Sequence, residues 1–162
     1  MAADSTTKEI KDRLAAYTAM LRRIDNNIER IERMEATMTS PKAQQLDAMP
    51  HSGGPAGDRM ADMIARKEEL EQKAREAIAE ERAEHDALAA MVDQLPKPDE
   101  SAVIEMRYFD RMSWPDVSEA LFGDRVDYIE KYDSYMRRTL RIHGAALVGL
   151  AELNRAAQSP RA

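Results

Sequence analysis

Hydrophobic residues near the start of the chain recur at alternating steps of four and three. Proline follows at position 41 and excludes the residue before it from helical geometry. A heptad spacing kept for about three heptads is typical of a helix that packs along a seam against another helix. The pattern therefore predicts one long coiled-coil helix that ends near residue 40. Its seam is formed by Ile10, Leu14, Tyr17, Leu21, Ile24, Ile28, Ile31 and Met38.

The stretch "SPKAQQLDAMPHSGGPAGD" (residues 40–58) contains three prolines and three glycines, a composition that favours a loop. From Asp58, apolar residues resume at helical spacing and continue to Leu95. This second pattern is weak where Glu81 and Glu84 occupy seam positions. Two long helices joined by a loop predict a helical hairpin or coiled coil over residues 1–95, with a Gly/Pro-rich connector at 40–58.

The C-terminal residues 96–157 predict further helices, so we expect an all-α fold. "DESAVIEMRYF" predicts a helix capped by Asp99, and "SWPD" predicts a second, short helix capped by Ser113. Gly123 is expected to end that short helix in the left-handed conformation. Trp114 is expected to be a buried anchor of the short helix. Residues 158–162 are expected to form a disordered tail.

The last helical pattern has two faces, one apolar and one basic. From Ser134 to Arg155 there are four arginines and one glutamate, in a chain whose net charge is -6. A short helix, a turn and a longer helix with a basic outer face form the arrangement whose second helix enters the DNA major groove. The charge pattern alone leaves two interpretations open, a DNA-binding surface and a solvated helix face, and the solvated face is the more common of the two.

The segment between Gly123 and Ser134 is about ten residues longer than a tight turn requires. If the last helix began early, the positions that usually meet bases would carry Asp127, Glu130 and Asp133. Carboxylates repel phosphates, so we favour a separate turn, with Ser134 as the helix cap.

The chain has no cysteine, and its three histidines are far apart, so we expect no disulfide and no metal site. No glycine-rich phosphate loop or nucleophile signature is present, so we expect neither an enzyme nor a cofactor. The N-terminus is charged, and no apolar run reaches the length of a membrane span. We therefore expect a cytoplasmic protein.

Residues 95–150 resemble the DNA-binding region four of bacterial sigma factors. The segments that carry the resemblance are "LPKPDESAVIEMRYFDRMSWPDVSEALFG" and "SYMRRTLRIHGAALVGLA". In organisation, the whole chain is similar to small phage-encoded sigma-like helix-turn-helix proteins, related to phage late-gene transcription activators. The resemblance implies that residues 137–143 belong to the recognition helix. Together with the basic face, it predicts double-stranded DNA as the partner, contacted by Ser134, Tyr135, Arg137, Arg138 and Arg141. It also implies a motif core of Tyr108, Trp114, Val117, Leu121, Ile142, Ala146, Leu147 and Leu150.

The function expected from these features is a phage or prophage transcriptional regulator in the bacterial host cell. The N-terminal helices are expected to form a homo-oligomer, and host RNA polymerase is a further partner that the resemblance allows. Two alternatives remain open. One is a DNA-packaging protein like the small subunit of a terminase, and the other is a coiled-coil scaffold that binds no nucleic acid.

Overall fold

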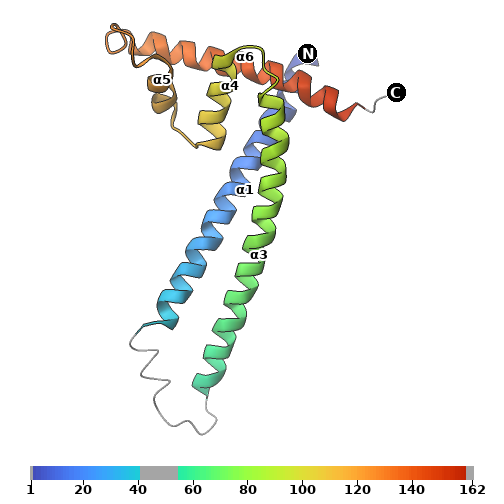
Figure 1. Cartoon of the computed structure of the whole chain (residues 1–162), viewed down its shortest axis with the longest axis vertical. Coiled ribbons are helices and arrows are strands. Elements are labelled where there is room, and N and C mark those ends of the chain that lie inside the picture. Colours follow the sequence, from blue (N-terminus) through green and yellow to red (C-terminus); the bar gives the residue numbers. More distant parts are fainter. Residues whose placement is uncertain (1, 41–54, 160–162) are drawn as a thin grey trace. The chain divides into compact units, whose positions relative to one another are not determined.

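The computed structural model describes residues 2–40 and 55–159 of the chain. All the regular structure in these ranges is helical (Figure 1). The predicted all-α fold, with two long N-terminal helices followed by shorter C-terminal ones, is confirmed. The elements are α1 (Ala2–Met38), α3 (Pro55–Val92), α4 (Pro98–Ile104), the π-helix η1 (Glu105–Phe109), α5 (Trp114–Phe122) and α6 (Tyr132–Gln158).

The helix ends differ from the predicted ones by a few residues. α3 begins at Pro55, within the predicted connector 40–58, because proline needs no hydrogen-bond partner for its nitrogen in the first turn of a helix. The rest of that connector, residues 41–54, lies outside the described residues. At the other end of the chain, α6 includes Gln158, so the predicted tail begins in a helix. The last three residues of the tail also lie outside the described part.

The chain divides into two compact units. The larger unit contains residues 1–18 and 83–162, and the hairpin unit contains residues 19–82. Each long helix therefore contributes to both units. The predicted domain 96–157 lies wholly within the larger unit, which also includes the first turns of α1 and the last turns of α3.

In the hairpin unit, α1 and α3 lie side by side and antiparallel (Figure 1). The ammonium nitrogen of Lys67 on α3 is 3.1 Å from a carboxylate oxygen of Glu35 on α1. A short apolar seam between the helices buries Ile24, Leu70 and Ala74. Other apolar side chains stay 39–43% exposed, so the two helices do not cover all of their apolar surface. These exposed residues are Ile28, Ile64 and Ile78.

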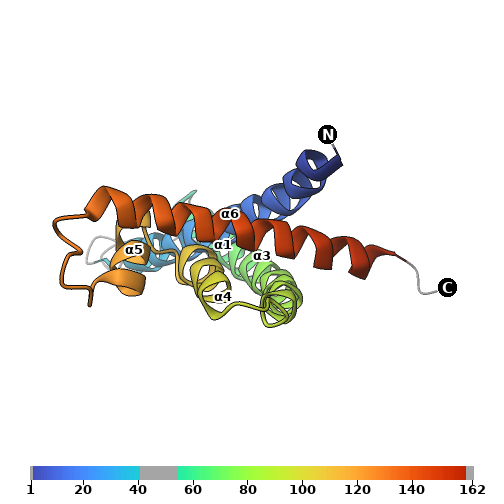
Figure 2. The same ribbon diagram turned by 90° about the horizontal axis from the view of Figure 1, so that it is seen from above.

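The larger unit has a tight core built around α6. Viewed from above, α6 passes across α4 and α5 (Figure 2), and it packs against both. The most deeply buried side chains come from α1, α3, α4, α5 and α6, and each is at most 1% exposed. They include Ile10, Leu14, Leu88, Val92, Val103, Ile104, Val117 and Leu150.

An ion pair explains why a glutamate occupies the seam of α3. The guanidinium of Arg13 on α1 donates hydrogen bonds of 2.6 and 3.1 Å to the two carboxylate oxygens of Glu84. The same guanidinium donates a third bond, of 2.7 Å, to the side-chain oxygen of Asn154 on α6, which is buried. A polar cluster thus joins three helices at a position where the sequence alone shows only a weakened pattern.

Candidate nucleic-acid interface

The short helix α5 begins as predicted. The hydroxyl of Ser113 accepts a hydrogen bond of 3.3 Å from the backbone N–H of Asp116, which satisfies one of the free donors of the first turn. Gly123 ends the helix with φ -58°, so the predicted left-handed conformation is wrong. The glycine is required for a different reason, because a Cβ there would lie 2.5 Å from the carbonyl oxygen of Glu119.

The helix before α5 also departs from its predicted start. Lys97 is the N-cap of α4, Pro98 is its first residue, and Asp99 lies in the first turn and is not the cap. α4 then continues into the π-helix, where the backbone N–H of Asp110 donates to the carbonyl of Glu105 at 2.9 Å. The wider turn carries Arg107 and Tyr108 toward α5 and α6.

Trp114 is half-buried, so it is a less complete anchor than the sequence suggested. Its ring packs edge-on against His143 of α6, with ring centroids 4.8 Å apart, and the guanidinium of Arg107 lies 4.8 Å from its ring. The Tyr108 hydroxyl lies 3.0 Å from Nε2 of His143. Trp114 therefore joins η1, α5 and α6 through its contacts with Arg107 and His143.

The eight residues predicted as the motif core divide into two groups. Four are buried: Val117 of α5 and Ala146, Leu147 and Leu150 of α6. The other four are half-buried: Tyr108, Trp114, Leu121 and Ile142. The buried group lies where α6 packs on its neighbours, and the half-buried group lies at the edges of that contact.

Residues 123–131 form their own turns, and α6 begins at Tyr132. The separate turn that we favoured is therefore present, but Ser134 is not the cap. Lys131 is the N-cap, and its carbonyl already accepts from the backbone N–H groups of Ser134 and Tyr135 at 3.0 and 3.1 Å. Ser134 is an exposed residue within the first turn of α6.

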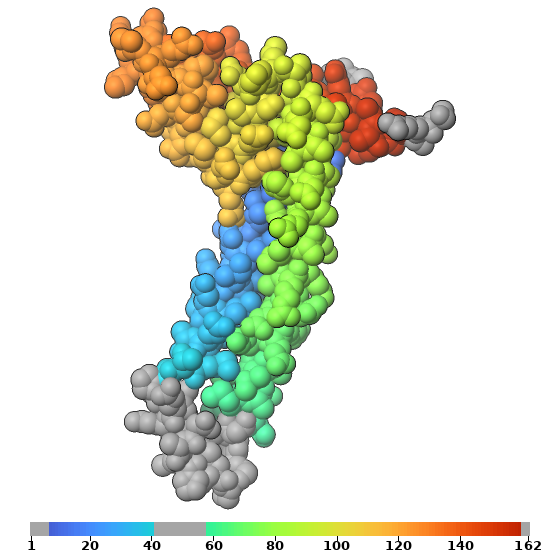
Figure 3. All heavy atoms as spheres, viewed as in Figure 1, coloured from blue at the N-terminus to red at the C-terminus, as the bar shows by residue number. Residues whose placement is uncertain are grey.

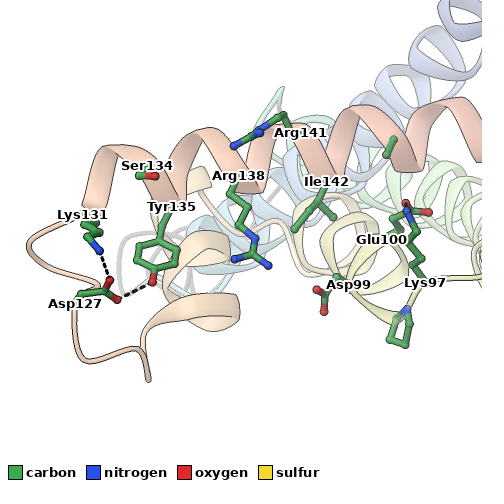
Figure 4. Close-up of a pocket in the computed structure, with 12 residues that line it drawn as sticks. Lys97, Asp99, Glu100, Asp127, Lys131, Ser134, Tyr135, Arg138, Arg141 and Ile142 are labelled. Atoms are coloured by element: carbon green, nitrogen blue, oxygen red, sulfur yellow. Dashed lines mark hydrogen bonds and ion pairs between the residues drawn. The ribbon is translucent and has the colours of Figure 1, made fainter.

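The hydroxyl of Tyr135 holds the turn in place. It donates a hydrogen bond of 2.6 Å to Asp127, which also forms an ion pair of 2.8 Å with Lys131 (Figure 4). The hydrogen bonds from Lys131 and then Tyr135 lower the pKa of Asp127 to about 2. The ring of Tyr135 packs against Phe122 and Tyr128, with centroids 5.1 and 5.6 Å away. Tyr135 is thus half-buried and its hydroxyl already has an acceptor.

The three predicted arginines lie exposed on α6, after this turn. Among the side chains that the structure describes, those of residues 7–40 and 58–159, none forms an ion pair with Arg137, Arg138 or Arg141. The guanidinium of Arg138 lies 5.0 Å from the ring centroid of Phe122, a cation–π contact that fixes its direction. Four of the five predicted DNA contacts are therefore solvent-exposed, and Tyr135 is the exception.

An open hollow of about 870 Å³ lies beside α6 (Figure 4). α4 and the 123–131 turn complete its wall, and the space-filling view shows α4, α5 and this turn as one continuous surface (Figure 3). Four basic side chains line the hollow: Lys97, Lys131, Arg138 and Arg141. Sequence reasoning missed Lys97. Its position between two prolines marks a helix start, but only the packing of α4 on α6 brings it to this hollow.

No group of three or more histidine or acidic side chains in the described part of the chain could hold a metal ion. No described helix is both long and apolar enough to cross a membrane.

A family model described as "Protein of unknown function (DUF1492)" matches residues 37–138. The match covers more than half of the 162 residues. It includes most of the hairpin unit, α4, α5, the 123–131 turn and the first two turns of α6. No curated protein and no solved structure matches the chain.

Proposed function

This chain belongs to the DUF1492 family, and we propose that it is a transcriptional regulator that binds duplex DNA through a sigma-like helix-turn-helix. The observation that carries the proposal is the set of exposed arginines without ion pairs on α6, the second helix of the α5–α6 pair. Arg137, Arg138 and Arg141 would supply the contacts to guanine edges and phosphates. The resemblance of residues 95–150 to sigma region four supports the same assignment.

The charge of the surroundings favours a specific basic surface. The chain carries a net charge of -6, so the protein as a whole does not attract DNA. A surface that lacks a nucleic-acid role would gain little from arginines left without ion pairs. On α6 the acidic residue nearest the arginines is Asp133, in the first turn, and the turn's own Asp127 is neutralised by Lys131.

The hairpin unit supplies the proposed means of self-association. Ile28, Ile64 and Ile78 are each 39–43% exposed on a pair of helices that buries few apolar side chains. A second copy that packs on these residues would complete the seam as a four-helix arrangement. A dimer would present two copies of α6 to the two halves of a DNA site. Host RNA polymerase stays a partner that only the resemblance suggests.

The proposal is tested by DNA binding of a triple variant, Arg137→Ala with Arg138→Ala and Arg141→Ala. A duplex selected by the wild-type protein from a randomised library serves as the probe in fluorescence anisotropy. The wild type should bind with a slope of log K against log salt of about -3 per domain, because each neutralised phosphate contributes about -0.9. The triple variant should lose binding with an unchanged circular dichroism spectrum.

The matched control removes three exposed arginines from the hairpin unit, by Arg22→Ala with Arg23→Ala and Arg75→Ala. This control changes the net charge by the same amount and should bind DNA as the wild type does. Equal losses in the two triple variants would mean that total charge decides binding and that α6 is not the interface. A wild-type protein that selects no duplex and binds none at low salt would refute the function.

A further inference from the structure

The basic side chains of the hollow come from three separate segments. Lys97 is the N-cap of α4, Lys131 ends the 123–131 turn, and Arg138 and Arg141 lie on successive turns of α6. No single amphipathic helix produces this grouping, since it depends on how α4 and the turn pack beside α6. The hollow is therefore a feature of the folded unit and not of one basic helix face.

The acidic side chains at the hollow are largely occupied by other contacts. Asp127 accepts from Lys131 and from Tyr135. Glu100 is only 7% exposed, and its carboxylate lies 3.5 Å from the ammonium nitrogen of Lys97. Asp99 is thus the carboxylate that opposes an anion most directly. Arg138 and Arg141 have no ion pair with a described residue and outnumber it.

The contacts of Arg138 restrict the direction of its side chain. Its guanidinium rests on the ring of Phe122, while Ile142 and Ala145 give the hollow an apolar wall. A side chain whose direction is already fixed loses less conformational entropy on binding. A planar guanidinium also matches the two free oxygens of a phosphodiester.

Arg137 lies on a different side of α6. Successive residues of an α-helix are about 100° apart, so the side chains of Arg137 and Arg138 leave the helix in different directions, and Arg137 does not line the hollow. The arginines of α6 therefore face two environments. One is the open outer face of the helix, and the other is the hollow that α4 helps to form.

We propose that the hollow holds the phosphodiester backbone of one DNA strand between Lys97 of α4 and Arg138 of α6, while Arg137 contacts base edges. This inference rests on the proposed function and adds that different residues contact the DNA backbone and the bases. Lys97 becomes a DNA contact outside the helix-turn-helix. Phosphate contacts strengthen binding to every sequence alike, whereas base contacts discriminate between sequences.

The test compares Lys97→Ala, Arg138→Ala and Arg137→Ala on the selected duplex and on a scrambled duplex, from about 50 to about 200 mM salt. Lys97→Ala and Arg138→Ala should each weaken both duplexes by the same factor and reduce the salt slope by about 0.9. Arg137→Ala should weaken the selected duplex more than the scrambled one. Arg138→Lys, which retains the charge, should keep most of the salt slope. This control distinguishes the loss of a positive charge from a disturbance of the fold at Phe122.

Two further variants sharpen the result. Lys8→Ala removes an exposed lysine that does not line the hollow and should leave the slope unchanged. Asp99→Asn removes the opposing carboxylate and should strengthen binding to both duplexes. If Lys97→Ala and Arg138→Ala still bind DNA with unchanged salt slopes, the hollow does not hold the DNA backbone. The proposed function would not be affected by that result. Calorimetric binding of inorganic phosphate that depends on Lys97, without any slope change, would also overturn this inference by assigning the hollow to a small anion.

Discussion

The hydroxyl of Tyr108 and Nε2 of His143 lie 3.0 Å apart, at hydrogen-bond distance, and so connect the π-helix to the middle of α6. Burial is the main reason that the pKa of His143 falls to about 4, and the positive charges of Arg107 and Lys11 lower it further. The imidazole is therefore neutral at pH 7 and packs as a polar ring between Tyr108 and Trp114. This relationship makes the stability of the larger unit sensitive to acid.

The free energy of unfolding should fall as the pH is lowered from 6.5 toward 4. In this window the unfolded chain binds a proton at His143 and the folded chain does not, so acid favours the unfolded state, and above 6.5 the effect is absent. Urea unfolding followed by circular dichroism at several pH values measures the slope, which should reach at most about one proton. His143→Gln should flatten it, and an equally steep slope in this variant would assign the effect to other groups.

Trp114→Ala should lower the unfolding free energy of the larger unit by about 2 kcal/mol, less than the roughly 3–5 kcal/mol typical of a fully buried aromatic. The ring is half-buried, so it loses the contacts with His143 and Arg107 but creates only a small cavity. Urea denaturation followed by circular dichroism measures the change. Trp114 is the only tryptophan, so its fluorescence in the wild type reports the same site. Emission identical in the folded and urea-unfolded protein would contradict the half-buried position of the ring.

Arg13→Ala should destabilise the fold by about 1–3 kcal/mol, because it leaves the buried oxygen of Asn154 without its donor and Glu84 without its cation. A matched control is Arg33→Ala, which breaks an exposed ion pair with Glu29 and should cost less than about 0.5 kcal/mol. Chemical denaturation of both variants gives the comparison. Equal costs would show that the Arg13 cluster contributes no more than a surface pair.

Two glycine substitutions should change stability in opposite directions. Gly144 lies exposed within α6, where an added Cβ meets nothing within 4 Å, so Gly144→Ala should stabilise by up to about 1 kcal/mol through helix propensity. Gly123→Ala should destabilise by about 1–3 kcal/mol, because its Cβ would press on the backbone carbonyl of Glu119. Thermal unfolding monitored by circular dichroism distinguishes the two. A destabilising Gly144→Ala would indicate a constraint that the fold does not reveal.

Local patterns in the sequence were sufficient to predict the helices and one of their caps. The long helix α1 and the "SWPD" start of α5 were both confirmed, because helix formation and capping depend on residues close together in the sequence. The predicted seam of α1 is confirmed only in part, since Ile28 is exposed. Backbone choices at the helix ends were harder to predict. Ser134 is a better capping residue than Lys131, yet the chain already turns into α6 at Lys131, because Tyr128 and Tyr135 pack there.

The parts of the candidate site that depend on tertiary packing could not be predicted. Lys97 and Arg138 are 41 positions apart in the sequence and line the same hollow only because α4 packs on α6. Tyr135 has the helical position of a DNA contact, but its hydroxyl is committed to Asp127. The basic arc of α6 was visible in the sequence, whereas the hollow beside it was not.

The hydrogen bond from Arg13 to Asn154 joins residues 141 positions apart. The larger unit combines residues 1–18 with residues 83–162, and Ile10 and Leu14 of α1 are fully buried in its core. Removal of residues 1–18 would therefore open this core. The surface that we propose for DNA binding consequently depends on the first turns of α1, although no residue of that helix lines the hollow.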